Sequence, residues 1–149
     1  MGTRSTIAKV EPDGSVTSIY CHWDGYPDHN GRVLLENYQD EPVVDDLLSG
    51  GSLSSLGAII GTKHPFDRRP GDEEYERKYR NMCLYYHRDR DEDWAHTQPR
   101  KHASLAEFLA TDREEWTYLW TPEGWRFGSG HEIELAPLTI TACDDKENQ

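Results

Sequence analysis

The chain has 149 residues and a net charge of −12 at pH 7, from 28 acidic and 16 basic side chains. A chain of this length buries one hydrophobic core, so we expect a single domain. Hydrophobic residues make up 35% of it, and its 11% of aromatic residues excludes a disordered protein. The negative charge argues against direct binding to nucleic acid or to an anionic membrane surface, because both attract cationic proteins.

Three widely separated cysteines, Cys21, Cys83 and Cys143, do not form a disulfide framework. They are typical of a reducing compartment, so we expect a cytoplasmic protein. No apolar run has the length of a membrane span, and the first residues lack a signal-peptide pattern.

The first expected element is a β-hairpin over about residues 4–23. Two runs rich in β-forming residues flank "EPDGS", in which Gly14 supplies the positive φ of a tight turn. On the second strand, alternation places Ile19, Cys21 and Trp23 toward the core and His22 on the opposite face with Tyr20. Truncation of a core Trp23 to alanine is then expected to cost about 3–5 kcal/mol.

The middle of the chain predicts short helices and charged loops. "RVLLENY" (32–38) and "EPVVDDLLSGG" (41–51) have apolar residues at helical spacing, and 52–60 predicts one further helical turn. Residues 61–81 and 88–102 are charged and predict loops on either side of a strand over 82–87. A capping box, Ser104 with Glu107, begins another short helix over 104–110.

The chain then predicts a second hairpin over about 115–128, an edge strand within 131–141 and a polar tail over 143–149. Strands joined by tight turns, with helices grouped between them, indicate an α+β fold. We therefore expect one domain over 1–142, with a mostly antiparallel sheet built from the two hairpins and short helices packed on it.

Chemically useful side chains gather at the ends of two predicted strands. "IYCHWDGYP" brings Tyr20, His22, Asp24 and Tyr26 into one stretch, and His87 and Asp89 follow the strand over 82–87. Tyrosine, histidine and tryptophan are frequent in binding hot spots, so we take these six residues as a candidate surface for a partner or ligand. A purely structural interpretation competes with it, in which Asp24 closes a turn, Gly25 has a positive φ and Trp23 belongs to the core.

A catalytic interpretation is the alternative. His22, Asp24, His87 and Asp89 could form a His/Asp cluster if the two strand ends meet, as in a small metal-dependent hydrolase or nuclease. However, the sequence has no metal-binding or nucleophile motif of recognisable spacing. We therefore assign no catalytic or metal-binding residue and expect no cofactor.

Acidic residues raise a third hypothesis, that the chain mimics DNA. The candidates are Asp40, Glu41, Asp45 and Asp46 and the run over 72–76. Basic residues interrupt most of the acidic runs, which is more typical of solvated surface than of copied phosphate spacing.

Three segments together resemble a family of small phage and prophage proteins: "TRSTI", "IYCHWDGYP" and "NGRVLLENY". The shared pattern is a TRS start, a Y-x-HWDGYP element, a glycine and a helix with LL-x-x-Y, here over Thr3–Tyr38. The segments "YYHRDRDED" and "EEWTYLW" with "GWRF" are similar more loosely, and 61–81 is not covered. The resemblance implies a phage or prophage source and carries no activity to transfer.

These observations lead to one expected function. We expect a small acidic accessory protein of phage type, without enzymatic activity, that binds a host protein or a small signalling molecule, for instance in counter-defence. The partner is expected to be neither nucleic acid nor a membrane, and assembly into a homo-oligomer is left open.

Overall fold

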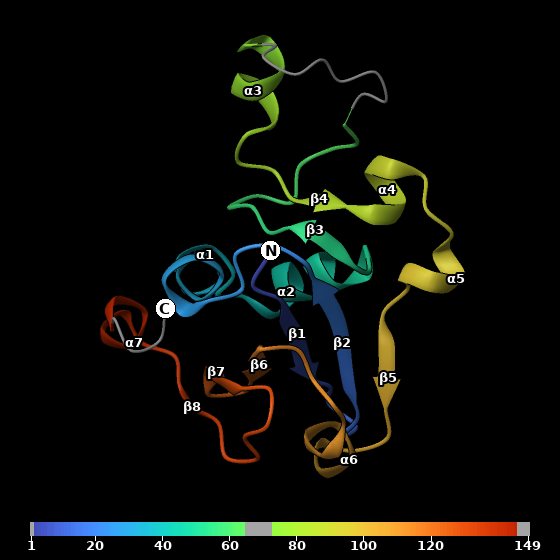
Figure 1. Cartoon of the computed structure of the whole chain (residues 1–149). Helices are drawn as coiled ribbons and strands as arrows, with labels where there is room; N and C mark the ends of the chain where they lie inside the picture. The colour runs from blue at the N-terminus through green and yellow to red at the C-terminus, as the bar shows by residue number, and fades with distance from the viewer. Residues whose placement is uncertain (1, 65–72, 146–149) are drawn as a thin grey trace.

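The two predicted hairpins form the centre of the sheet in the computed structural model, which describes residues 2–64 and 73–145 (Figure 1). Strands β1 (Ser5–Val10) and β2 (Val16–Cys21) make the first, and β6 (Trp116–Thr121) and β7 (Gly124–Ser129) make the second. Gly14 has the expected positive φ, +89°. The hairpins join through β1 and β6, which are parallel.

Four short strands complete an eight-stranded sheet: β3 (Leu53–Ser55), β4 (Leu84–Tyr85), β5 (Arg100–His102) and β8 (Ala136–Pro137). The order is β4-β3-β2-β1-β6-β7-β8, and β5 pairs with the first half of β2. The β2–β3 pairing is parallel, whereas the remaining described pairings apart from β1–β6 are antiparallel. The α+β fold with a mostly antiparallel sheet is confirmed.

The helices are short, and they follow from local patterns. They are the π-helical turn η1 (Pro27–Gly31), α1 (Arg32–Asn37), α2 (Glu41–Ser49), α3 (Glu73–Tyr79), α4 (Tyr86–Arg90), α5 (Trp94–Thr97), α6 (Leu105–Ala110) and α7 (Ile140–Asp144). The Ser104 side chain caps α6 by accepting a hydrogen bond from the Glu107 amide, as expected.

Clusters of buried side chains lie on both faces of the central strands. Ile7, Ile19 and Cys21 face a large core to which α1 and α2 contribute Leu34 and Leu47. The opposite face is covered at one end by a smaller cluster of Ala8, Val16, Phe108, Leu119 and Leu135, in which α6 supplies Phe108. Because α6 covers only one end of β2, the other end of that face, around Tyr20, is left partly exposed.

Several local expectations are wrong. Residues 53–55 form β3 instead of a helical turn, because Leu53 pairs with Cys21 and Tyr85 and fills the core. The strand expected over 82–87 is only two residues long and continues directly into α4.

Both segments expected to be charged loops contain regular structure. The segment 61–81 includes α3, and 88–102 includes the end of α4, α5 and β5. Residues 65–72 of the first segment lie outside the described residues. Cys143 and Asp144, expected in the polar tail, belong to α7, and Cys143 is fully buried. The packed fold therefore extends past residue 142, and 146–149 lie outside the described residues.

Candidate functional site

The segment His22–Pro27 leaves the sheet through an irregular turn that hydrogen bonds to neighbouring segments hold in place. Gly25 donates its amide to the Thr3 carbonyl at 2.7 Å, and its own carbonyl accepts from the buried Tyr118 hydroxyl at 2.6 Å. Asp24 has a left-handed φ of +58°, whereas the φ of Gly25 is not positive. The expected positive φ at Gly25 is therefore wrong, because the preceding aspartate makes the reversal.

Trp23 is 44% exposed, so its expected place in the core is wrong. The backbone explains the difference. The consecutive amides of His22 and Trp23 both donate toward β3, to the carbonyls of Leu53 and Ser54. In a regular strand neighbouring amides point to opposite sides, so this pair interrupts the alternation in the manner of a bulge. Cys21 is the last residue of this strand directed into the core.

Tyr20, His22 and Trp23 form a chain of contacts at the end of β2. The Tyr20 hydroxyl lies 2.6 Å from Nδ1 of His22, and the His22 ring meets the Trp23 ring edge-on with centroids 4.7 Å apart. Burial raises the pKa of Tyr20, while the nearby Arg4 guanidinium opposes that rise. Tyr20, His22 and Tyr26 are all partly exposed, as expected.

Tyr86 joins this group across the sheet. Cys21, Leu53 and Tyr85 form one cross-strand row that faces the core. Next to this row lie Tyr20 on β2, Ser52 directly before β3 and Tyr86, the first residue of α4, and the Tyr86 amide donates to the Ser52 carbonyl. Tyr86 is also close enough to Tyr20 to influence the ionisation of its hydroxyl. Side chains of adjacent rows point to opposite faces, so Tyr20 and Tyr86 share the face away from the core. We call Tyr20, His22, Trp23 and Tyr86 the aromatic cluster.

The other predicted site residues have separate surroundings. The Asp24 carboxylate accepts a long hydrogen bond from the Tyr26 hydroxyl, at 3.5 Å. The His87 Nδ1 lies 2.7 Å from the Glu92 carbonyl, and its ring lies beside that of Trp94. The structure therefore brings Tyr20 and His22 into direct contact and places Asp24 and Tyr26 on the adjoining turn, while His87 makes its contacts on the α4–α5 segment.

Asp89 has a structural environment. Its side chain is fully buried, and its carboxylate accepts hydrogen bonds from the amides of His64 and Tyr85, at 3.0 and 2.7 Å, and from the Arg88 guanidinium. A carboxylate so fully occupied is not available to a reacting group or a metal ion. Within residues 2–64 and 73–145, no group of three His, Cys, Asp or Glu side chains is arranged to hold a metal ion.

The acidic residues considered for DNA mimicry are partly neutralised. Lys9, only 3% exposed at its side chain, forms ion pairs with Glu11, Glu41 and Asp45 at 3.0, 2.8 and 2.6 Å. Two of the candidate acids on α2, Glu41 and Asp45, thus form ion pairs with a buried lysine. Asp72, in the run over 72–76, lies outside the described residues. This arrangement favours a structural role for the acidic end of α2.

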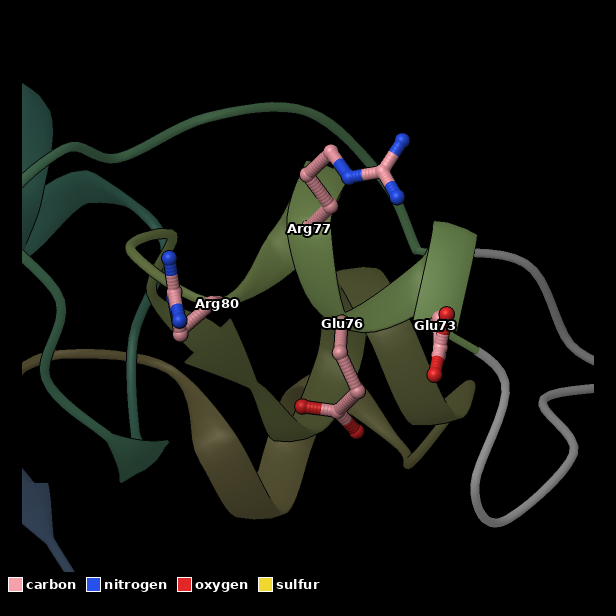
Figure 2. A pocket seen from close by; sticks show the side chains of 4 residues that line it. All are labelled: Glu73, Glu76, Arg77 and Arg80. Atoms are coloured by element: carbon pink, nitrogen blue, oxygen red, sulfur yellow. The ribbon is translucent and has the colours of Figure 1, made fainter.

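A surface hollow of about 450 Å³ lies along α3, and the described residues that line it are Glu73, Glu76, Arg77 and Arg80 (Figure 2). Figure 2 shows the Arg77 guanidinium pointing away from both carboxylates. Mixed exposed charges without an aromatic side chain are typical of a solvated helix surface. The aromatic cluster is therefore the stronger candidate site.

Sequence reasoning missed two members of this site. Tyr86 is missed because "LYYH" does not reveal which tyrosine faces the core. Trp23 is missed because the strand alternation that predicts it in the core stops at Cys21, before it reaches Trp23. Comparisons with protein-family models, curated proteins and solved structures gave no match. Among the described helices, none has the length and apolar composition required to cross a bilayer.

Proposed function

We propose that this chain is a non-enzymatic binding protein whose recognition surface is the aromatic cluster. The observation that carries the proposal is an exposed tryptophan held in place by its neighbours. Trp23 donates its amide to Ser54, its carbonyl accepts from the buried Asn30 side chain, and its ring packs on His22. A large side chain that is exposed and already ordered loses little entropy on binding, which is typical of interface hot spots.

The binding interpretation is preferred to the catalytic one because the His/Asp cluster lacks an available carboxylate at Asp89. The resemblance to small phage and prophage proteins supports an accessory role in an infected host, with a host protein or a signalling molecule as the partner. The net charge of −12 is compatible with such a role, since it keeps the chain away from polyanions at long range.

Quantitative affinity capture tests the proposal. The wild-type chain, Trp23→Ala and the control Ile133→Ala are immobilised, and proteins and small molecules retained from bacterial lysates are compared by mass spectrometry. Ile133 is 70% exposed and lies on the loop between β7 and β8, so its truncation controls for the loss of an exposed apolar side chain. We expect a partner retained by wild type and Ile133→Ala but lost with Trp23→Ala. Equal retention by all three chains would contradict the proposal.

A further inference from the structure

Three arginines surround the aromatic cluster without an acidic partner. Arg4, Arg90 and Arg100 are exposed, and none of them forms an ion pair within residues 2–64 and 73–145. In a chain with 28 acidic side chains, three guanidinium groups without an ion pair beside one cluster are available to an anionic group. One carboxylate also acts on this cluster, because Glu114 lies close enough to Tyr20 to raise the pKa of its hydroxyl.

Strand register places Arg100 on the same face as Tyr20. Arg100 of β5 pairs with Ser18 of β2, and Ser18 lies two residues before Tyr20. Residues paired across strands and residues two apart along a strand share one face of a sheet. Arg100 therefore projects from the face that also carries Tyr20 and Tyr86.

Arg4 and Arg90 approach the cluster from two other sides. Arg4 directly precedes β1, and its guanidinium lies close enough to Tyr20 to influence the ionisation of that hydroxyl. Arg90 lies one helical turn after Tyr86 on α4, with its guanidinium carbon 5.5 Å from the centre of the Tyr86 ring. Arg4 and Arg90 are thus each adjacent to an aromatic ring.

His22 adds a further polar group. Its Nδ1 contacts Tyr20, whereas its Nε2 has no hydrogen-bond partner among the residues that the structure describes. If the Tyr20 hydroxyl donates to Nδ1, Nε2 carries the ring proton and can donate to a ligand. Planar rings, guanidinium groups and a ring N–H are the groups that recognise a flat base bearing a phosphate.

We propose that the aromatic cluster with Arg4, Arg90 and Arg100 binds a nucleotide, the base stacking on the exposed rings and the phosphate contacting the arginines. This inference rests on the proposed function and narrows its partner to the signalling-molecule class. The same chemistry could come from a free nucleotide or from one unit of a single strand. The net charge of −12 favours the free nucleotide, because a polyanion is repelled by the whole chain.

Isothermal titration calorimetry tests the proposal with defined probes: ATP, GTP, cyclic di-GMP, tripolyphosphate and a single strand of deoxythymidine nucleotides. We expect saturable binding of a free nucleotide, at least about tenfold weaker binding of tripolyphosphate, and an affinity loss of about tenfold in Trp23→Ala and in Arg4→Gln. Ile133→Ala and Arg77→Gln, on other surfaces, are expected to bind as the wild type does. Circular dichroism of each variant verifies that it is folded.

The outcomes separate this inference from the proposed function. Binding of the single strand alone would support the nucleotide chemistry and assign the strand as its source. No saturable binding of any base-bearing probe, or unchanged binding by both Trp23→Ala and Arg4→Gln, would overturn the inference. A protein captured in a Trp23-dependent manner together with no nucleotide binding would overturn the inference and leave the proposed function standing.

Discussion

The side-chain amide of Asn30 donates a hydrogen bond to the carbonyl of Trp23, 3.1 Å away, and thereby joins η1 to the turn that presents the aromatic cluster. Asn30 is fully buried, and the same amide lies within hydrogen-bonding distance of Ser5 Oγ and Cys21 Sγ. One buried side chain thus connects β1, β2 and the turn. The backbone at Trp23 has already left the strand, so the hydrogen bond from Asn30 helps to hold it in the position that exposes the Trp23 ring.

Replacement of Asn30 by leucine keeps a similar volume but removes these hydrogen bonds. We expect the free energy of unfolding to fall by about 1–3 kcal/mol, because the Trp23 carbonyl and Ser5 hydroxyl lose a buried partner. Urea denaturation of Asn30→Leu measures the change. Asn37→Leu, at an exposed position on α1, is the control and should remain within about 0.5 kcal/mol of wild type.

Trp23→Ala is expected to lower stability by only about 1 kcal/mol, well below the cost of truncating a core tryptophan. The ring loses its edge-on contact with His22, but 44% of the residue is already in water. Thermal and urea melts of this variant beside Trp125→Ala provide the comparison, since Trp125 is 4% exposed and is expected to cost about 3–5 kcal/mol. Equal losses in the two variants would show that Trp23 is a core residue after all.

Gly25→Ala is expected to destabilise the chain by about 1–3 kcal/mol through overlap. An added Cβ would lie 2.8 Å from both the Thr3 carbonyl oxygen and the Arg4 carbonyl carbon, which are backbone atoms. The cause is close approach, since the φ of Gly25 is not positive. Gly14→Ala separates the two effects: Gly14 has φ +89° with open space around its Cβ position, so backbone strain alone should cost about 1 kcal/mol there.

Sequence periodicity predicted the elements that have a strong local pattern. The hairpin turn at Gly14, the helix over 41–49 and the Ser104 cap all follow from interactions within a few residues, and all are present. Non-local pairing decided the others. Leu53 is part of a strand only because Cys21 and Tyr85 lie on either side of it, and no local pattern contains that information.

The candidate site could be predicted only in part for the same reason. Tyr20 and His22 were placed on the face away from the core by alternation, and they lie there. Tyr86 reaches that face because β3 pairs with β2 on one side and with β4 on the other, and the sequence does not reveal these pairings. Asp89 is of a residue type that is common in catalytic sites. Its structural role becomes visible only in the fold, where its carboxylate accepts hydrogen bonds from the amides of His64 and Tyr85, which come from two different segments.

Asp89→Asn tests this structural assignment. The carboxylate accepts from two backbone amides and from Arg88, so an amide in its place loses the charge and turns one acceptor into a donor. We expect a loss of about 3–5 kcal/mol in the free energy of unfolding, as for a broken buried ion pair. Asp91→Asn, on the neighbouring exposed position, is the control and should stay near wild type. A wild-type melting temperature for Asp89→Asn would restore Asp89 as a functional candidate.

The ion pairs of Lys9 predict how stability depends on pH. Partial burial opposes the ionisation of Glu11, but hydrogen bonds from Thr17 and Lys9 outweigh it and lower the Glu11 pKa below its usual 4.5. Burial likewise opposes the charge on Lys9, yet its bonds to Asp45, Glu41 and Glu11 outweigh burial and raise the Lys9 pKa. A lowered carboxyl pKa stabilises the fold above the unfolded value, and a raised lysine pKa stabilises it below the unfolded value.

The stabilisation from this group of charges is therefore complete between about pH 5 and pH 10, and it is lost as the pH falls through the lowered Glu11 pKa or rises toward the raised Lys9 pKa. Lys9→Met removes the shared cation while keeping much of its buried stem. We expect this variant to lose about 1–2 kcal/mol at neutral pH, because the largely buried Glu11 loses its cation while the half-exposed Glu41 and Asp45 remain solvated. It should also lose less further stability than wild type on acidification from pH 5 to pH 3. Urea midpoints at each pH measure both effects. Lys63→Met is the control, since it breaks an exposed ion pair with Asp91 and should follow the wild-type curve within about 1 kcal/mol. Parallel acid curves for wild type and Lys9→Met would contradict the role assigned to the Lys9 ion pairs.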